Sequence, residues 1–341
     1  MSDLAGRAAR YRPLVTEEMR AVVGSSPGPL YAWMRYHLGW EDQQGAAVSA
    51  SPGKLMRPVA VLLAAELSGG NADAAVPAAA AVELVHNFSL LHDDIEDASE
   101  FRRGRLNLWK FAGAPQAINT GDGMFVVARL AQYRLLDTGV PADRTLAAMR
   151  ELDEACLRLV QGQYLDMSFE TRQDVTLPEY LEMAAGKTAA MFAAPFAIGA
   201  TIGGAAPAVV DAFREFGRRV GLAFQAVDDV LGIWGDPAVT GKPVGDDLSA
   251  RKMTYPVIVA LSSPGEEAEA LRRAYARPPS GSDDLAAMGG WIEATGARAA
   301  TEAMAREETR AALDGLRRAG LPESTLAVCL EFAEAAVGRV S

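Results

Sequence analysis

Three aspartates are grouped at the end of a long apolar stretch of the sequence. Asp93 and Asp97 are four positions apart, so on a helix their carboxylates lie on one face, with Asp94 beside them. Like charges at this spacing repel each other unless a cation lies between them. Sites made only of oxygen atoms suit Mg²⁺, which commonly shares them with substrate phosphates. A solvated helix end is the alternative, and an isolated D-D-x-x-D does not exclude it.

Basic residues follow this acidic group within two helical turns. Arg102 and Arg103 belong to the segment "RRGR", and a guanidinium group can bind two oxygens of a phosphate at once. Arginines next to metal-binding carboxylates would form a diphosphate site. Pairing with Glu96 and Glu100 on the surface would explain the same residues, with little gain in energy. This segment alone leaves both interpretations open.

A second acidic group follows another apolar stretch, much later in the chain. Asp228 and Asp229 end the segment "VGLAFQAVDD", and the Gly-rich loop after them contains Lys242 and Lys252. Two further acids of this loop are Asp246 and Asp247. Two helices that end in paired aspartates, each followed by cations, predict one shared cavity in which metal ions clamp a diphosphate.

The composition indicates what kind of protein positions these residues. Half of the 341 residues are apolar, and the formal net charge is −11. Nucleic-acid binding is not expected, because proteins that bind nucleic acids usually carry a basic patch. Cys156 and Cys329 form neither a disulfide framework nor a metal-ligand spacing, and the N-terminal segment lacks the apolar core of a secretory signal. We therefore expect a cytoplasmic protein.

Helices are the elements that the sequence predicts nearly everywhere, because apolar residues recur at helical spacing and alternating strand patterns are scarce. With no linker to divide it, residues 1–341 are expected to form one all-α domain, a helical bundle around a central active-site cavity. The uncharged segment 188–210 contains Pro195 and Pro207, and is expected to be a buried helix broken near the prolines, not a membrane span. The predicted helices are 15–24, 29–39, 53–69, 74–98, 115–136, 142–169, 177–203, 207–236, 251–262, 264–277, 283–316 and 321–338.

Five motifs, in order, resemble those of a known family. "LLHDDIED" and "FQAVDDVLGIWGD" resemble the two aspartate-rich motifs of the trans-isoprenyl diphosphate synthases, or polyprenyl synthetases. "GKLMRP", "GKTAAMF" and "GDDLSARKMTYP" resemble three further segments of that family, so the resemblance covers roughly residues 50 to 260. It implies the isoprenoid synthase fold, and a Mg²⁺-dependent condensation of isopentenyl diphosphate with an allylic diphosphate (dimethylallyl, geranyl or farnesyl).

The resemblance also implies a role for individual residues. Three Mg²⁺ ions per active site would be bound by Asp93, Asp94, Asp97, Asp228 and Asp229. The allylic diphosphate would contact Arg102, Lys187, Lys242 and Lys252, and Thr188 and Gln225 would lie near the reacting carbon. The second substrate, isopentenyl diphosphate, would bind Lys54, Arg57, His86 and Arg103. Without the flanking motif, His86 would be interpreted as a core histidine.

The residues before the first motif bear on the length of the product. Phe88 lies five residues before Asp93, and the resemblance implies that a bulky side chain here closes the floor of the product pocket. The small Ser89 leaves room above that floor. The first motif also lacks a two-residue insertion seen in many bacterial relatives. This combination resembles synthases of the C20 product, geranylgeranyl diphosphate, and the family habit predicts a homodimer.

Two positions depart from the family pattern. Gly232 stands where many relatives have a third aspartate in the second motif, so this side of the cavity is expected to offer fewer ligands. Leu106 and Asn107 replace the usual Pro-Thr, which leaves the geometry of that loop open. Gly232 keeps a class I terpene cyclase on the same fold as an alternative, although a cyclase needs no isopentenyl diphosphate site. A non-catalytic subunit, the third interpretation, would typically have lost residues such as Asp93.

Overall fold

A computed structural model describes residues 3–24, 26–48, 53–237, 243–279 and 281–338. The chain folds into two compact units, of which the first comprises Met1–Glu154 and Ala194–Phe213 and the second Ala155–Ala193 and Arg214–Ser341. The described residues form helices, apart from a hairpin of β1 (Phe101–Arg102) and β2 (Arg105–Leu106) and one isolated bridge. The all-α prediction is confirmed, and the single domain stays a prediction.

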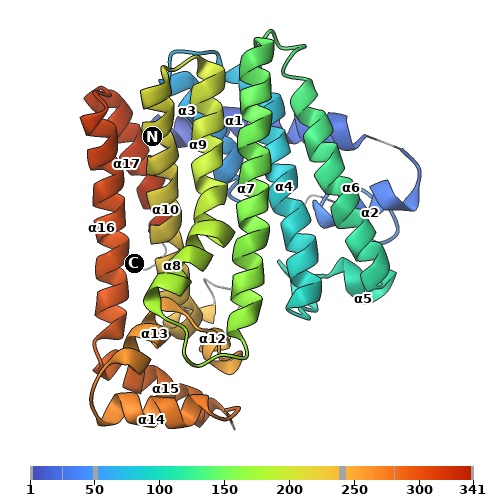
Figure 1. Ribbon diagram of the computed structural model, residues 1–341. Coiled ribbons are helices and arrows are strands. Elements are labelled where there is room, and N and C mark those ends of the chain that lie inside the picture. The colour runs from blue at the N-terminus through green and yellow to red at the C-terminus, as the bar shows by residue number, and fades with distance from the viewer. Residues whose placement is uncertain (1–2, 25, 49–52, 238–242, 280, 339–341) are drawn as a thin grey trace. The chain divides into compact units, whose positions relative to one another are not determined.

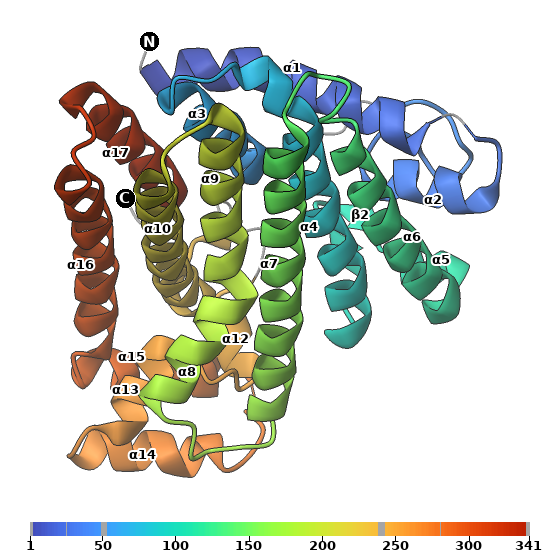
Figure 2. The same ribbon diagram turned by 45° about the horizontal axis from the view of Figure 1, so that its top comes forward.

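The first unit is built around α4 (Val76–Glu96), the helix that carries the first acidic group. Its first half is almost completely buried, because its many alanines allow neighbouring helices to approach closely. α6 (Ala114–Tyr133) runs beside α4, and α3 (Met56–Leu67) also packs against it (Figure 1). α1 (Asp3–Val23) lies across α3 and α4 (Figure 2). These contacts fix the direction in which the acidic end of α4 points.

A glycine brings the backbones of α3 and α9 (Ala190–Gly203) into direct contact. A Cβ atom at Gly199 would lie 2.1 Å from the carbonyl oxygen of Val61, so no larger residue fits at this crossing. Pro195 lies inside α9, whereas the chain does break before α10 (Pro207–Trp234). The predicted break is therefore confirmed at the second proline and wrong at the first.

The stretch Ala72–Glu96 is long and apolar enough to cross a membrane, judged by length and composition alone. It consists of a short 3₁₀ helix, η1 (Ala72–Ala75), followed by α4, and 72% of its most apolar window is buried inside the protein. The core helix of a protein without any span passes the same test, so this is weak evidence for a span.

In the second unit, α8 (Leu177–Ala184) continues without a break into a turn of π-helix, η2 (Ala185–Ala189). Turns of π-helix are rare and are frequently found at functional sites. α10 packs directly against this turn, because a Cβ atom at Gly221 would lie 2.5 Å from the Cα atom of Ala189. The segment that carries the predicted Lys187 and the helix that carries the second acidic group are thus in contact.

Further helices complete both units. α7 (Ala142–Phe169) contributes to both, and α2 (Pro29–His37) and α5 (Leu108–Ala112) belong to the first. The second unit also contains α12 (Asp246–Ser249), α13 (Tyr255–Ser262), α14 (Glu266–Tyr275), α15 (Ser282–Ala294), α16 (Ala297–Arg318) and α17 (Glu323–Val337). Buried side chains of α8, α10, α13, α14 and α15 form its main hydrophobic cluster.

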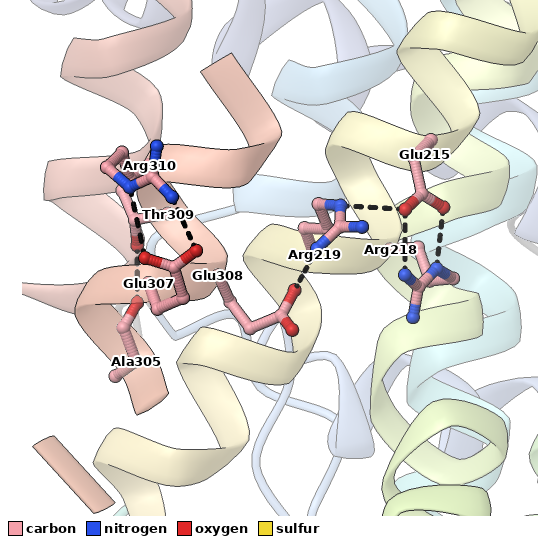
Figure 3. Close-up of polar contacts among 8 residues, drawn as sticks. All are labelled: Glu215, Arg218, Arg219, Ala305, Glu307, Glu308, Thr309 and Arg310. Atoms are coloured by element: carbon pink, nitrogen blue, oxygen red, sulfur yellow. Dashed lines mark hydrogen bonds and ion pairs between the residues drawn. The ribbon is translucent and has the colours of Figure 1, made fainter. Parts of the chain in front are cut away.

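Ion pairs connect α10 with α16 in the second unit (Figure 3). Glu215 accepts two hydrogen bonds from Arg218, at 2.6 and 2.7 Å, and pairs with Arg219 at 2.7 Å. Arg219 in turn donates to Glu308 of α16 at 3.0 Å. A single exposed ion pair contributes little to the stability of a protein. This network includes partly buried side chains, so its contribution is larger. It stabilises the position of α10, the helix that carries the second acidic group.

Most predicted helices are confirmed to within a few residues, with two corrections. The N-terminal helix begins at Asp3 and not at residue 15. The prediction of one helix over 283–316 is wrong, because Gly296 adopts a φ of 78° and separates α15 from α16. The hairpin, α5 and α12 were not predicted, since each is too short to show a hydrophobic period.

Candidate active site

The first acidic group lies at the end of α4 in the first unit. Asp97 is the C-cap residue of the helix, and its backbone N–H donates to the carbonyl oxygen of Asp93 at 2.8 Å. Asp97 is exposed and Asp93 is partly buried, whereas Asp94 is only 2% exposed. The three acids are therefore not equivalent, since two are accessible from solvent and one faces the protein.

Arg102 binds the buried aspartate. Its Nε and Nη2 atoms lie 2.8 and 2.7 Å from Asp94 Oδ1. Burial raises the pKa of Asp94 above its ordinary value, and Arg102 opposes that rise only in part. The second oxygen, Oδ2, is buried and accepts no hydrogen bond from the described residues. Glu100, an alternative partner for the arginines, instead accepts a hydrogen bond from Lys110 at 2.7 Å.

The hairpin of β1 and β2 sends the two arginines in different directions. Its turn residues, Arg103 and Gly104, both have positive φ, 52° and 73°, as in turns whose twist matches the flanking strands. Asn107 closes the loop by donating from Nδ2 to the carbonyl oxygen of Ser99 at 2.8 Å. The departure from the family pattern at this position is thus compatible with an ordered loop, in which Arg102 reaches back to α4.

The residues predicted for the second substrate are brought together in the first unit. A Cβ atom at Gly53 would lie 3.0 Å from Nη2 of Arg103, so the glycine leaves room for this arginine beside Lys54, which is exposed. Arg57 Nη1 lies 3.4 Å from His86 Nε2. Burial, Arg57 and Arg103 hold the pKa of His86 well below 6.5, so the ring is neutral. Its contact with a guanidinium group distinguishes His86 from an apolar core histidine.

A cavity of about 350 Å³ opens next to Arg103. Its wall includes Arg102, Arg103 and Arg105, together with His37 and Asn87. Burial and the three arginines lower the pKa of His37 to about 3, so the histidine adds no charge to the wall. Arg105 donates to two backbone carbonyl oxygens at 2.8 and 2.6 Å and so supports the wall. Such a surface attracts anions.

Glu83 is a buried acid that was not predicted. It is 5% exposed and lies one turn before Asn87, whose Nδ2 donates to Oε1 of Glu83 at 3.1 Å. Burial raises the pKa of Glu83 to about 7, although Arg57 acts in the opposite direction. A single acid within the apolar run "AAVELV" is the signal that could have identified it.

Phe88, the predicted floor of the product pocket, is part of an aromatic cluster between α4 and α6. Its ring lies 5.1 Å from the ring of Phe125 and 5.5 Å from that of His92. A Cβ atom at Gly121 would lie 2.3 Å from Nε2 of His92, so α6 needs a glycine where this ring packs. Ser89 donates to a backbone carbonyl oxygen at 2.8 Å. Phe125 was not predicted.

Lys187 lies in the π-helical turn of the second unit. A Cβ atom at Gly162 of α7 would lie 2.1 Å from the backbone nitrogen of Lys187, so α7 touches this turn directly. Lys187 Nζ lies 2.5 Å from Oδ2 of Asp166, which is also on α7. Asp166 was not predicted, although it is an acid near the end of the helix that precedes the "GKTAAMF" segment.

Thr188, Gln225 and Asp229 are joined by hydrogen bonds in the second unit. Thr188 Oγ1 donates to Gln225 Oε1 at 2.6 Å, and Gln225 Nε2 donates to Asp229 Oδ1 at 2.8 Å. Oδ2 of Asp229 accepts from the hydroxyl of Tyr180 at 2.6 Å and from the backbone N–H of Tyr255 at 2.7 Å. Burial raises the pKa of Asp229 to about 7 despite these donors. Tyr180 was not predicted.

The neighbouring aspartate of the second motif, Asp228, is exposed. One turn further along α10, a Cβ atom at Gly232 would lie 1.9 Å from Oδ2 of Asp247. The space for a third aspartate is thus filled by a carboxylate from a different segment. Lys252 is partly buried, and its backbone N–H donates to the carbonyl oxygen of Asp247 at 2.9 Å. Lys242 lies outside the described residues.

The donor set of the first unit fits Mg²⁺ held together with a phosphate. Within the described residues, no three acids or histidines are close enough together to hold an ion by themselves. Mg²⁺ is usually bound through one or two carboxylates, several waters and substrate phosphates. Asp93 and Asp97 provide hard oxygen donors, and Asp94 keeps one buried oxygen without a hydrogen bond among the described residues.

Strained backbone conformations are found next to the predicted site residues. Among the described non-glycine residues, Leu55, Ala98, Arg103 and Arg251 have positive φ, between 49° and 52°. Leu55 follows Lys54, Ala98 follows Asp97, and Arg251 precedes Lys252. Such conformations persist where the surrounding structure fixes them, and they are often found at functional sites.

Comparison with known proteins gives a consistent result. The profile of the family described as "Polyprenyl synthetase" matches residues 42–289. A (2E,6E)-farnesyl diphosphate synthase of Mycobacterium tuberculosis is 41% identical over 331 residues, which cover 96% of this chain and 90% of the relative. A geranylgeranyl diphosphate synthase of the same organism is 44% identical over 260 residues, 76% of this chain and 73% of the relative.

The fold is also similar to solved structures. The crystal structure of a polyprenyl synthetase from Streptomyces coelicolor A3(2) matches with a TM-score of 0.90 and 38% sequence identity, covering 98% of this chain and all of that one. The isoprenoid synthase fold is therefore confirmed.

Proposed function

The chain belongs to the polyprenyl synthetase family, and from this premise we propose that it makes geranylgeranyl diphosphate. It is a trans-prenyltransferase that condenses isopentenyl diphosphate with an allylic diphosphate, and members of the family use Mg²⁺. The class I terpene cyclase and the non-catalytic subunit are thereby set aside. The C20 product, the ligand set and the oligomeric state are the parts that we propose.

The acids of both motifs would hold three Mg²⁺ ions on the allylic diphosphate. In the first unit, Asp93 and Asp97 are the accessible members, and Arg102 holds Asp94 beside them. In the second unit, Asp228 is the accessible member of its pair. Bound Mg²⁺ would neutralise the negative charge that develops on the leaving diphosphate. We propose that the two units belong to one catalytic domain.

The basic residues would divide between the two diphosphates. Arg102, Lys187, Lys242 and Lys252 are proposed to contact the allylic diphosphate, with Lys242 outside the described residues. Lys54, Arg57, His86 and Arg103 are proposed to bind isopentenyl diphosphate. The proximity of Arg57 to His86 and of Arg103 to Gly53 supports this second group. Because His86 is neutral, it can donate or accept a hydrogen bond without repelling the neighbouring arginines.

The residues of the chain would then assist a cationic reaction. The bond between the allylic carbon and the diphosphate oxygen breaks, and the double bond of isopentenyl diphosphate attacks that carbon. A proton is then lost from the new product to the released diphosphate. Thr188 and Gln225 are proposed to lie near the reacting carbon, where their oxygen dipoles would stabilise developing positive charge. Apolar walls such as the cluster at Phe88 exclude water, which would otherwise capture the cation.

The ring contact between Phe88 and Phe125 is the observation that supports the C20 product. It connects α4 with α6, and on this proposal it would block further extension of an apolar chain. The small Ser89 leaves room above this floor. The similarity to a farnesyl diphosphate synthase makes the C15 product the competing possibility.

A product assay tests the proposal. The protein is incubated with isopentenyl diphosphate and dimethylallyl, geranyl or farnesyl diphosphate, with and without Mg²⁺, and the products are separated by chromatography. We expect a Mg²⁺-dependent C20 product from each allylic substrate. Accumulation of C15, with farnesyl diphosphate left unused, would overturn the C20 assignment.

The Phe88→Ala variant tests the floor. Removing the ring opens space below Ser89, so we expect products longer than C20, measured by the same chromatography. Phe111→Ala is the matched control, because Phe111 is likewise partly buried and packs against an aromatic ring of the first unit, that of Tyr36 at 5.0 Å. A Phe88→Ala enzyme with the wild-type product distribution would contradict the assignment of Phe88 as the floor of the product pocket.

We propose a homodimer because α6 and α7 each carry exposed apolar side chains at helical spacing. On α6, Val126, Leu130 and Tyr133 are 52%, 57% and 55% exposed and recur at helical spacing. On α7, Leu157, Val160, Tyr164 and Met167 are exposed at similar spacing. Exposed apolar side chains that recur on one side of a helix commonly mark a protein interface. Sedimentation analysis should give a dimer, and Leu130→Glu should shift it to a monomer. Cys156 and Cys329 are both buried and are not joined in a disulfide, which supports the proposed cytoplasmic location.

A further inference from the structure

Asp229 and its neighbour Asp228 are both aspartates, but their environments differ. It is 3% exposed, and both of its oxygens accept hydrogen bonds. Oδ1 accepts from Gln225 Nε2 at 2.8 Å, and Oδ2 accepts from the Tyr180 hydroxyl at 2.6 Å and the Tyr255 backbone N–H at 2.7 Å. A carboxylate has about four lone-pair positions, and three are used here. The one position left, on Oδ1, belongs to a side chain that is only 3% exposed, so Asp229 is much less accessible to a metal ion than the exposed Asp228.

The aspartate determines which way the side-chain amide of Gln225 points. An ionised carboxylate only accepts hydrogen bonds, so once Asp229 is deprotonated the NH₂ group of Gln225 must face it. The opposite orientation would place Gln225 Oε1 against Oδ1 of Asp229, with two acceptors and no proton between them. Gln225 Oε1 therefore faces Thr188, whose hydroxyl donates to it at 2.6 Å. The hydroxyl oxygen of Thr188 retains its own lone pairs.

The backbone holds the two ends of this chain of contacts together. Thr188 belongs to the π-helical turn, and Gly221, one turn before Gln225, allows α10 to touch that turn. At the other end, the rings of Tyr180 and Tyr255 pack edge to face, with centroids 5.7 Å apart. The tyrosine hydroxyl is thus fixed where it reaches Asp229.

We propose that Tyr180 and Asp229 are positioning residues, which orient Gln225 and Thr188 so that their oxygen atoms face the reacting carbon. Asp228 is then the metal ligand of the pair, and Asp229 is not. The sequence of contacts runs from Tyr180 to Asp229, from Asp229 to Gln225, and from Gln225 to Thr188. This inference rests on the proposed function, because that proposal places Gln225 and Thr188 at the allylic carbon.

The test compares Tyr180→Phe with Tyr11→Phe. Tyr11 is a matched control: it is buried, and its hydroxyl donates to the carboxylate of Glu66 in the first unit. We expect Tyr180→Phe to lower kcat roughly tenfold through misorientation of Gln225, with the KM for both substrates and the Mg²⁺ activation constant within twofold of wild type. Tyr11→Phe should leave kcat unchanged. A wild-type kcat in Tyr180→Phe would overturn the proposal.

A double-mutant cycle asks whether Tyr180 acts through Gln225. In a Gln225→Ala background the tyrosine has no amide left to orient, so Tyr180→Phe should have no further effect on kcat. Independent, multiplicative losses would contradict the proposed relay, that is, the series of hydrogen bonds from Tyr180 through Asp229 and Gln225 to Thr188. Asp229→Asn adds a second arm, in which a tenfold rise of the Mg²⁺ activation constant would identify Asp229 as a metal ligand and overturn its assignment.

These outcomes are separable from failure of the proposed function. If the wild-type protein forms no elongated product from any allylic substrate, the function is wrong. The relay is then still measured by thermal unfolding, in which Tyr180→Phe and Gln225→Ala should be non-additive. Additive shifts of Tm in this cycle would overturn the relay whatever the activity.

Discussion

The two aspartate pairs, one at the end of α4 and one on α10, share a pattern of burial that the sequence does not show. In each pair the second member is buried, Asp94 at 2% and Asp229 at 3% exposure, and the first is more accessible. The buried members have different partners, since Arg102 binds Asp94 and only neutral donors bind Asp229. On the proposed assignment, a D-D motif combines one metal-binding carboxylate with one that organises the surrounding structure.

Substitution of the accessible aspartate of each pair should have the largest effect on catalysis. Asp93→Asn and Asp228→Asn each remove a charged oxygen donor, so we expect kcat to fall roughly 10² to 10³-fold and the Mg²⁺ activation constant to rise. Steady-state kinetics across a Mg²⁺ titration provide the measurement. If Asp228→Asn responds to Mg²⁺ as the wild type does, the assignment within the second pair is wrong.

The second largest effect is expected on the pH dependence of stability, to which the buried carboxyl groups should contribute. The pKa of Asp229 is about 7 in the folded protein, well above the ordinary carboxyl range near 4. Between these values the folded state holds a proton that the unfolded state has released. The free energy of unfolding should therefore fall as pH rises from about 4 to about 7, by at most about 1.4 kcal/mol per pH unit and group.

Glu83, whose pKa is also about 7, should add the same trend in the first unit. Denaturant unfolding at several pH values measures the slope, and Asp229→Asn and Glu83→Gln should each flatten it. Asp283→Asn changes an exposed acid and serves as the control. A wild-type slope in Asp229→Asn would show that this carboxyl does not titrate in that window.

Gly232→Ala tests the close approach that distinguishes the second motif. The added methyl group would lie 1.9 Å from Asp247 Oδ2, so the carboxylate must move, and we expect a loss of about 1–3 kcal/mol in the free energy of unfolding. Gly290→Ala is the matched control, because no atom lies within 4 Å of its Cβ position. It should be neutral or slightly stabilising, by up to about 1 kcal/mol. Equal stability of the two variants would contradict the packing of Asp247 against α10.

The smallest effect is expected at the end of α4. Ala98 has a φ of 49°, a conformation in which glycine is not strained. Ala98→Gly should therefore change the free energy of unfolding by no more than about 1 kcal/mol, with the release of strain opposing the added freedom of the unfolded chain. Denaturant unfolding measures it. A loss of several kcal/mol would show that the methyl group makes contacts that matter more than the strain.

The spacing of the acidic residues and the hydrophobic period predicted much of this architecture. The features that were not predicted have physical reasons. The acids, the helices that carry them and the motif order are local features that a sequence displays directly. Which aspartate of a pair is buried depends on partners far along the chain, such as Tyr180 for Asp229, and no local pattern reports it. Gly296 was missed because a single glycine is tolerated inside many helices, and only its φ shows that it ends α15.

Direct metal binding tests the central claim about the two pairs. Mn²⁺ is titrated into the wild type, Asp228→Asn and Asp229→Asn in the presence of a non-cleavable allylic diphosphate analogue, and bound ion is measured by electron paramagnetic resonance. We expect Asp229→Asn to bind as many ions as the wild type, with similar affinity, and Asp228→Asn to lose at least one. Loss of an ion from Asp229→Asn, with Asp228→Asn unaffected, would contradict it.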